Sequence, residues 1–291
     1  MLLKNRNRVK NSTQGVVDMN FYWQCFKLAL VGLAVVNLLP TKVYSAPKIK
    51  VRELVVASAA GQLNFVPPPP PADIGIPGDR TGAGRRGCLA NHHDSVENKQ
   101  LTALVPITKA ATGLEVVWGL TTVEHPTFWF YVPYRAQDVH SARFVLRTAD
   151  NQLVYQTSVS LPNKPGVISL TLPTTVSLEV TKGYHWYFNI YCAQGKPPTA
   201  IVHGGVQRRT ITPALASQLA QATPQQRAEL YFANGFWFDA VTTLGQLHYH
   251  NPGNMALAQN WTDVLRFVGL DAIASEPIAS CCDLMQQVRR D

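Results

Sequence analysis

The feature that most constrains the fold is a series of short β-rich runs, divided by turn residues, across the middle of the chain. The runs lie at residues 101–106, 114–120, 127–133, 142–148, 152–159, 166–172, 184–192 and 200–209. Turn signals such as Asp150-Asn151 divide them, and no helical periodicity intervenes. Parallel sheets need long crossovers, usually helical, between their strands. The pattern therefore predicts an antiparallel β-sandwich of seven to eight strands over residues 100–210.

Beyond residue 210 the pattern becomes helical. Thr212-Pro213 and Thr223-Pro224 each set an N-cap residue before a proline at the first helical position. Four helices are predicted, at residues 213–222, 224–234, 236–249 and 255–268. The predicted fold class is therefore α+β, and residues 211–291 form a small helical subdomain that packs on the sandwich through one apolar face.

The two middle helices also match the spacing of a tetratricopeptide repeat. The small, aromatic, large apolar and proline positions of that repeat correspond to Ala228, Tyr231, Ala240, Leu244 and Pro252. A stable stacked array needs at least about three copies, and only one degenerate copy is present here. We therefore predict a tetratricopeptide-like layer, with an ordinary helical hairpin as the alternative.

The amino-terminal residues resemble an export signal. Basic residues up to Lys27 precede an apolar run at residues 28–39, which is shorter than the about 20 residues of a membrane-spanning helix. Residues 1–45 are thus predicted to be a cleaved signal peptide, or an uncleaved anchor if residues 21–23 extend the apolar run. We expect a periplasmic or extracellular protein whose mature form has no membrane span.

Residues 46–99 are predicted to be a Pro/Gly-rich tether, because five consecutive prolines at 67–71 precede a glycine-rich stretch. The net charge of +8 is concentrated before this tether. Six of the 26 Lys and Arg residues and one of the 18 acidic residues lie in the first 45 positions, which leaves +3 for the remainder. This balance excludes the basic signature of a nucleic-acid-binding protein.

The cysteines fit an oxidising compartment. If Cys25 leaves with the signal peptide, the disulfide candidates are Cys88, Cys192, Cys281 and Cys282. A bond between the two adjacent cysteines is strained. We therefore favour bonds from the carboxyl-terminal pair back to Cys88 and Cys192, with a metal or thiol site as the alternative.

The motifs predict no catalytic, cofactor or metal site. The sequence contains no serine-hydrolase elbow, zinc-protease motif or phosphate loop. His92 and His93 beside Asp94 are interpreted as solvated. His248 and His250 point in different directions on a helix, so they are also interpreted as solvated or capping residues.

Two aromatic strands carry the candidate ligand-binding residues. One face of each strand, with Phe128 and Phe130 on the first and Trp186 and Phe188 on the second, is predicted to be core. The opposite faces carry rings with polar tips, which could stack on sugars or peptides. These candidates are Trp129, Tyr131, His185, Tyr187 and Tyr191. The alternative, which we favour, is that the helical layer covers them.

Several long segments resemble a known family. They include "HPTFWFYVPY" (125–134), "YHWYFNIYC" (184–192) and "YFANGFWFDAVTTL" (231–244). With the Pro-rich lead-in and the cysteine after "GRRG", they resemble the cyanobacterial domain-of-unknown-function family 928 over roughly residues 66–282. The resemblance implies an exported cyanobacterial protein, associated with repeat proteins and adhesin-like partners. It implies no activity, because the family has no established catalytic residues.

The expected function is an exported, non-catalytic binding or assembly module of the cell envelope, whose partner is an envelope protein or a glycan. The export signal and the absence of catalytic motifs favour it. The alternative is an envelope hydrolase that acts on glycan or peptide, with a site assembled from His185, His203 or Asp239.

Overall fold

The computed structural model describes residues 65–71, 77–82, 88, 99–110 and 112–279. All of them belong to one compact unit, Val56–Asp291. The predicted signal peptide, much of the predicted tether, and Cys281 and Cys282 lie outside the described residues. Within the described ranges, none of the helices combines the length and apolar character that crossing a membrane requires.

Nine strands are present in the described part of the chain. They are β1 (Thr102–Ala103), β2 (Ile107–Lys109), β3 (Glu115–Thr121), β4 (Thr127–Val132), β5 (Ser141–Thr148), β6 (Leu153–Val159), β7 (Gly166–Thr171), β8 (Gly183–Tyr191) and β9 (Ala200–Arg208). Each of the eight predicted runs overlaps a strand, and β2 is an additional short strand that the pattern did not predict.

The strands form two sheets, with the orders β1-β4-β7 and β2-β3-β9-β8-β5-β6. Within these sheets, all but one of the pairs of neighbouring strands are antiparallel. The exception is β3 with β9, which pair in parallel with Trp118 opposite Gly205. The prediction of a purely antiparallel arrangement is therefore wrong at this pair. The strands β4 to β8 separate β3 from β9 in the sequence, so no hairpin fixes their relative direction.

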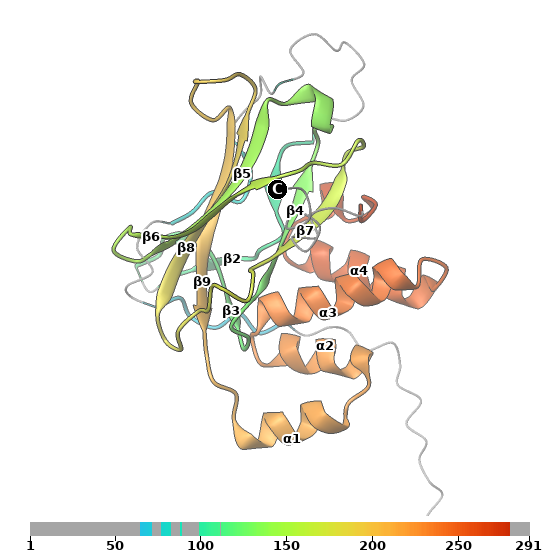
Figure 1. The fold of residues 1–291 in the computed structure, drawn as a ribbon. Coiled ribbons are helices and arrows are strands. Elements are labelled where there is room, and N and C mark those ends of the chain that lie inside the picture. The colour runs from blue at the N-terminus through green and yellow to red at the C-terminus, as the bar shows by residue number, and fades with distance from the viewer. Residues whose placement is uncertain (1–64, 72–76, 83–87, 89–98, 111, 280–291) are drawn as a thin grey trace, which may run out of the picture. The chain divides into compact units, whose positions relative to one another are not determined.

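The core lies between the two sheets (Figure 1). Phe130 of β4 stacks on Phe188 of β8, with ring centroids 4.5 Å apart, and Phe128 lies 5.0 Å from Phe144 of β5. These four rings and Trp186 are at most 1% exposed. Full burial of each such ring contributes about 1.5–3 kcal/mol to stability. The faces predicted to be core are confirmed.

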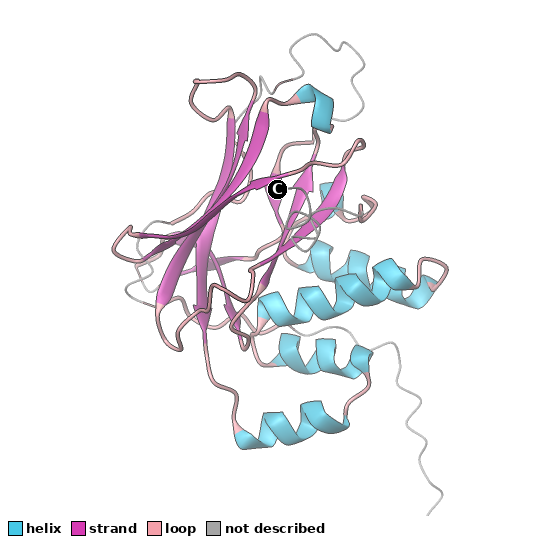
Figure 2. Cartoon of the chain, in the orientation of Figure 1, coloured by secondary structure: helices cyan, strands magenta, loops and turns pink. Residues whose placement is uncertain are grey.

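Four α-helices follow the strands, so the predicted α+β class is confirmed (Figure 2). They are α1 (Pro213–Gln221), α2 (Pro224–Ala233), α3 (Trp237–His250) and α4 (Met255–Phe267). Thr212 caps α1 by accepting from Leu215 N, as predicted, and Thr223 and Gln226 form a capping box at the start of α2. Between α2 and α3, Gly235 adopts a φ of +78°, a conformation that favours glycine.

The helices contact the strands in two regions. α3 contacts β3 and β4, whereas α1 and α2 reach the outer face of β3, where Trp118 shares an apolar cluster with Leu215 and Leu219. The predicted packing of the helices on the strands is therefore present (Figure 1).

Part of the predicted tether belongs to the folded unit. Asp79 pairs with His203 of β9, and Thr81 pairs with Thr102 of β1, so this segment contacts both sheets. Arg80 donates to the carbonyl oxygens of Val268 (2.6 Å) and Gly269 (3.1 Å), just beyond the end of α4. Phe65, which is 7% exposed and packs against Phe232 and Trp237, also belongs to the folded unit, so these described parts of the predicted tether are not a free linker.

Candidate functional site

The structure buries three of the five aromatic-strand candidates, and two of these are on β4. Trp129 and Tyr131 of β4 are 3% and 4% exposed. The indole N–H of Trp129 donates to Oγ1 of Thr242 (3.0 Å) on α3, and its ring centroid lies 5.6 Å from that of Trp261 on α4. The helical layer thus covers Trp129, as we expected under the alternative that we favoured. In this structure neither ring is available to a ligand, so both leave the set of candidates.

The remaining candidates lie on the outer face of β8. Tyr187 and Tyr191 are partly exposed. The Tyr187 ring stacks on His203 of β9, with centroids 5.3 Å apart and planes at 17°. The guanidinium of Arg143, on β5, lies 5.3 Å from the centre of the Tyr191 ring. A cation in this position is attracted to the electron-rich ring face.

His185 is on the same face but is only 6% exposed. Burial lowers its pKa, and the charge of nearby His203 lowers it further. His185 therefore stays neutral more readily than a solvated histidine, and it has little surface with which to contact a ligand. We assign it to the support of the face rather than to contact with a ligand.

The geometry of this face follows from strand pairing. Tyr187 and Tyr191 are four residues apart on one side of β8, so their Cα atoms are about 13 Å apart. Arg143 is the cross-strand partner of Asn189, and both lie between the two tyrosines. The result is an aromatic ring at each end of the surface and hydrogen-bonding side chains between them.

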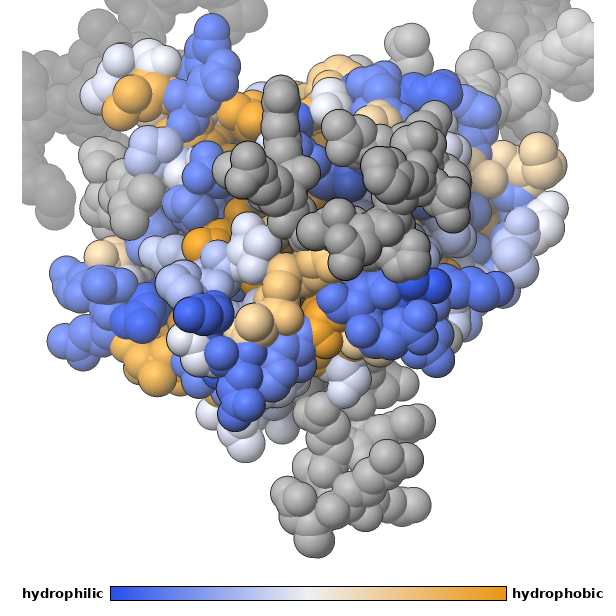
Figure 3. Space-filling model, turned by 90° about the horizontal axis from the view of Figure 1, so that it is seen from above, coloured by the Kyte–Doolittle hydropathy of each residue, from blue (hydrophilic) through white to orange (hydrophobic). Residues whose placement is uncertain are grey.

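In the described part of the chain, the helices leave this region of the sheet open. α1 and α2 pack on β3, toward one end of the strand order, whereas β8 and β5 lie toward the other. Figure 3, seen from the end that carries the β8–β9 connection, shows hydrophobic side chains in small groups between hydrophilic ones.

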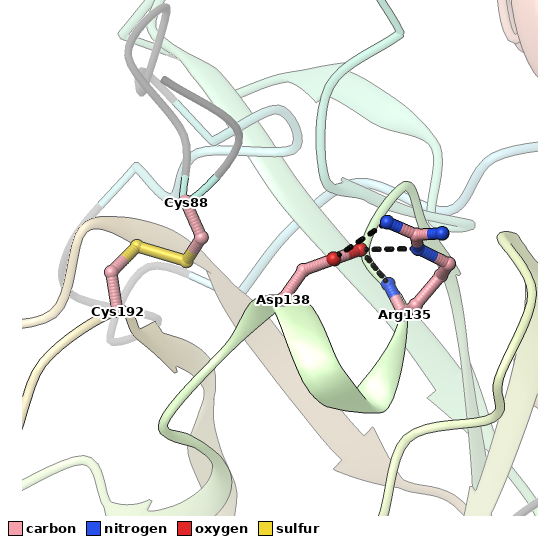
Figure 4. Close-up of a disulfide and its surroundings, with 4 residues drawn as sticks. All are labelled: Cys88, Arg135, Asp138 and Cys192. Atoms are coloured by element: carbon pink, nitrogen blue, oxygen red, sulfur yellow. Dashed lines mark hydrogen bonds and ion pairs between the residues drawn. A yellow bond between two sulfur atoms is a disulfide. The ribbon is translucent and has the colours of Figure 1, made fainter. Parts of the chain in front are cut away.

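A disulfide fixes the end of β8. Cys88 and Cys192 are bonded, with Cα atoms 5.1 Å apart (Figure 4). The favoured pairing of each with a carboxyl-terminal cysteine is therefore wrong. The physical reason is nonlocal, because Gly82 packs against Ala200, which pairs with Ile190 two residues before Cys192. The chain thus reaches Cys88 beside the end of β8.

Figure 4 also shows the ion pair next to this disulfide. In the short 3-10 helix η1 (Ala136–Asp138), Asp138 accepts from Nε (2.8 Å) and Nη2 (2.9 Å) of Arg135. The two parallel bonds hold the connection between β4 and β5.

A second candidate is a cleft of about 550 Å³ between the β3–β4 connection, the end of β9, and α2 and α3. Its titratable side chains include Glu124, Arg208, Tyr231 and Asp239. Burial raises the pKa of Asp239, and hydrogen bonds from Thr122 oppose that rise. Burial also raises the pKa of Tyr231, and the charge of Asp239 adds to this effect.

The charged groups of the cleft are engaged in holding the structure together. Thr122 donates to Asp239 through its backbone N–H (3.0 Å to Oδ2) and through its hydroxyl. Arg208 pairs with Glu124 at 3.1 Å, and His125 Nδ1 lies 2.7 Å from the carbonyl oxygen of Val176. Asp239 therefore anchors the start of α3 to the end of β3.

In the described structure His185 lies near His203, but Asp239 interacts with neither histidine. His203 contacts Tyr187, and its Nε2 lies 3.5 Å from Oδ2 of Asp79. Among the described residues, no hydrogen bond or ion pair joins Asp239 to His203 or His185. The remainder of the cleft is not predictable from local sequence, because its side chains come from strand ends and helices that are distant along the chain. The order of the residues contains no short motif that could have identified it.

The other histidines do not form a metal centre in the described structure. No group of three or more His, Cys, Asp or Glu side chains among the described residues could hold a metal ion. His248 stacks on Trp261 with centroids 6.2 Å apart, and His250 Nδ1 lies 2.8 Å from the carbonyl oxygen of Gln246. His92, His93 and Asp94 lie outside the described residues.

Comparison with known proteins gives a family but no activity. A search of curated proteins finds no match. The model of the family described as Domain of Unknown Function (DUF928) matches residues 81–278. That range is more than half of the 291 residues and contains both sheets and all four α-helices. The chain therefore belongs to the DUF928 family.

Proposed function

We propose that the chain is an exported, non-catalytic binding module of the cell envelope that recognises glycan through the outer face of β8. The observation that carries the proposal is the pair of partly exposed rings, Tyr187 and Tyr191, on a face that the described helices leave open. Tyrosine offers a rigid, amphipathic ring that loses little entropy on binding. Such rings stack well on the apolar faces of sugar rings.

The arrangement of the face favours an extended chain of sugars over a single one. The spacing of about 13 Å between the two tyrosines is wider than one sugar ring. Arg143 and Asn189, between the tyrosines, supply hydrogen-bond donors for sugar hydroxyl groups. A flat, open surface also suits a polymer better than a small molecule, which is usually enclosed in a cleft.

Export is supported by the chemistry of the cysteines. The Cys88–Cys192 disulfide is typical of proteins in oxidising compartments. The basic and apolar residues of the predicted signal at 1–45 are consistent with the same compartment. The proposal includes a periplasmic or extracellular location and the cyanobacterial origin that the family resemblance implies.

The proposal also takes the two facing sheets as a β-sandwich and the α2–α3 hairpin as tetratricopeptide-like. Ala228 and Ala240 support the second point, because both small side chains are at most 1% exposed within the helical layer. A single hairpin supplies no peptide-binding groove. Recognition of a partner is therefore assigned to the sheet and not to the helices.

The hydrolase alternative is supported less well. Asp239 accepts hydrogen bonds from Thr122, and in the described part of the chain it shares no interaction with the candidate histidines. A general acid or base must be within hydrogen-bond reach of the group it serves.

The proposal is tested by measuring the binding of the exported protein to polysaccharide purified from its own cell envelope. We expect binding that weakens about fivefold in each of Tyr187→Ala and Tyr191→Ala, because one stacked ring contributes about 1 kcal/mol. The control is Tyr249→Ala, which removes an exposed tyrosine from α3. The absence of any envelope glycan that binds, or equal binding by all four proteins, would contradict the proposal.

A further inference from the structure

The two edges of the six-stranded sheet differ in how well they are protected. One edge is β2, which has three residues and ends at the exposed Lys109. The other is β6, which has seven residues, LVYQTSV. A short strand or a lysine discourages edge-to-edge pairing, whereas a long, uncharged strand offers a row of backbone donors and acceptors to another strand. Only the β2 edge carries these protective features.

β6 is open on one side within the described structure. It pairs with β5 in regular register from Ala142–Val159 to Leu146–Tyr155, and the register then shifts before Arg147–Leu153. No other described strand pairs with it. Its sequence has no proline, no glycine and no charged residue. It is instead rich in the β-branched and aromatic residues that favour strands. Nothing in its sequence opposes a further strand.

We propose that β6 pairs antiparallel with β6 of a second copy of this chain, so that the two six-stranded sheets become one. Two copies of one strand that pair in this way are related by a two-fold axis, which is the commonest symmetry of soluble oligomers. With Gln156 on the axis, Tyr155 lies opposite Thr157 of the second copy, within the regular part of the strand. No like charges then face each other across the seam.

The charges beside β6 favour a second copy as the partner. Asp150 lies in the turn before β6 and Lys164 in the loop after it, and both are exposed. Antiparallel pairing sets the turn of one copy beside the loop of the other, so each Asp150 approaches the opposite Lys164. The two-fold axis repeats this attraction at both ends of the seam.

The pairing has a consequence for the face of β8. A two-fold axis perpendicular to the sheet keeps the same face of both copies on one side. Five strand spacings separate the two β8 strands, so the two tyrosine surfaces lie about 24 Å apart. If the proposed function holds, this dimer is bivalent and binds a polymer more tightly than one copy does. The dimer itself is independent of any ligand.

The test is the mass of the purified exported protein in solution, measured by light scattering and by sedimentation over a range of concentrations. We expect twice the chain mass at high concentration. Gln156→Lys sets two lysines opposite each other at the axis and should raise the dissociation constant about fivefold. The matched control is Gln218→Lys on α1, which adds the same charge at an exposed position away from β6.

A charge exchange gives a second readout. Asp150→Lys alone should weaken the dimer, and the combination with Lys164→Asp should restore it. A protein that stays monomeric at every concentration overturns the proposal. If the Gln156→Lys and Gln218→Lys variants form equally strong dimers, the proposal is also overturned, because the contact between the copies then lies elsewhere. Neither outcome depends on whether Tyr187 binds glycan.

Discussion

The covering of Trp129 by α3 predicts the sign of a glycine substitution. A Cβ atom added at Gly245 would lie 2.7 Å from Cη2 and 2.9 Å from Cζ2 of Trp129, and 3.0 Å from Cζ3 of Trp261. Alanine is favoured over glycine inside an isolated helix by about 1 kcal/mol. At this position the same change should destabilise the protein, because the added methyl group meets two buried rings.

The magnitude follows from the rigidity of those rings. Trp129 is held by its hydrogen bond to Thr242 and by contact with Trp261, and both rings are at most 3% exposed. Overpacking of this kind costs up to about 3 kcal/mol. After subtraction of the helix preference, Gly245→Ala should lower the free energy of unfolding by about 2 kcal/mol. For a domain of this size the melting temperature should fall by about 4–8 °C.

Denaturant unfolding of single and double variants checks the cause. Trp129→Phe removes the part of the indole that Gly245→Ala would meet, so the second change should cost about 1 kcal/mol less in the Phe background. Gly253→Ala, with no atom within 4 Å of the added Cβ, is the control and should be nearly neutral. A stabilising Gly245→Ala would show that α3 does not press on Trp129. The indole would then return to the ligand-binding candidates.

Two further predictions concern stability. Cys192→Ser should lower the free energy of unfolding by about 2–4 kcal/mol, because it opens a disulfide between cysteines 104 positions apart; denaturant titration checks this, and an unchanged midpoint would contradict it. Burial raises the pKa of Asp239 above its ordinary 3.8, so the folded protein binds more protons there than the unfolded chain. The stability contribution of this group therefore falls as the pH rises above about 4, so the stability of Asp239→Asn relative to the wild type should increase as the pH rises from about 4. A pH-independent difference between the two proteins would contradict the shift.

Much of the secondary structure follows from local sequence. Short β-rich runs between turn residues marked eight strands, and N-cap residues before prolines, such as Thr223 before Pro224, marked helix starts. These signals are strong because the residues of each strand or helix, and the turn or cap residues that bound it, identify it without reference to distant segments. The short β2 was missed because three residues are too few to show alternation.

Contacts between distant segments could not be predicted in this way. The parallel pairing of β3 with β9 and the Cys88–Cys192 bond both depend on which segments lie side by side. The cysteine count limited the bonds to a few alternatives, and only the packing of Gly82 against Ala200 distinguishes them. The cleft around Asp239 is of the same kind, because Thr122 and Asp239 are far apart in sequence.

The two aromatic strands show most clearly what alternation can and cannot predict. In β4 and in β8, period-two alternation correctly separated a core face from an amphipathic face. The alternation does not predict whether the amphipathic face of β4 or that of β8 is covered, because this depends on Gly245 of the distant helix α3. Gly245 lets α3 approach Trp129 closely, whereas among the described residues no helix packs on Tyr187. Trp129 on β4 and Tyr187 on β8 thus have similar local sequence patterns, but only Tyr187 is accessible. Tyr187 is therefore the position at which binding should first be sought.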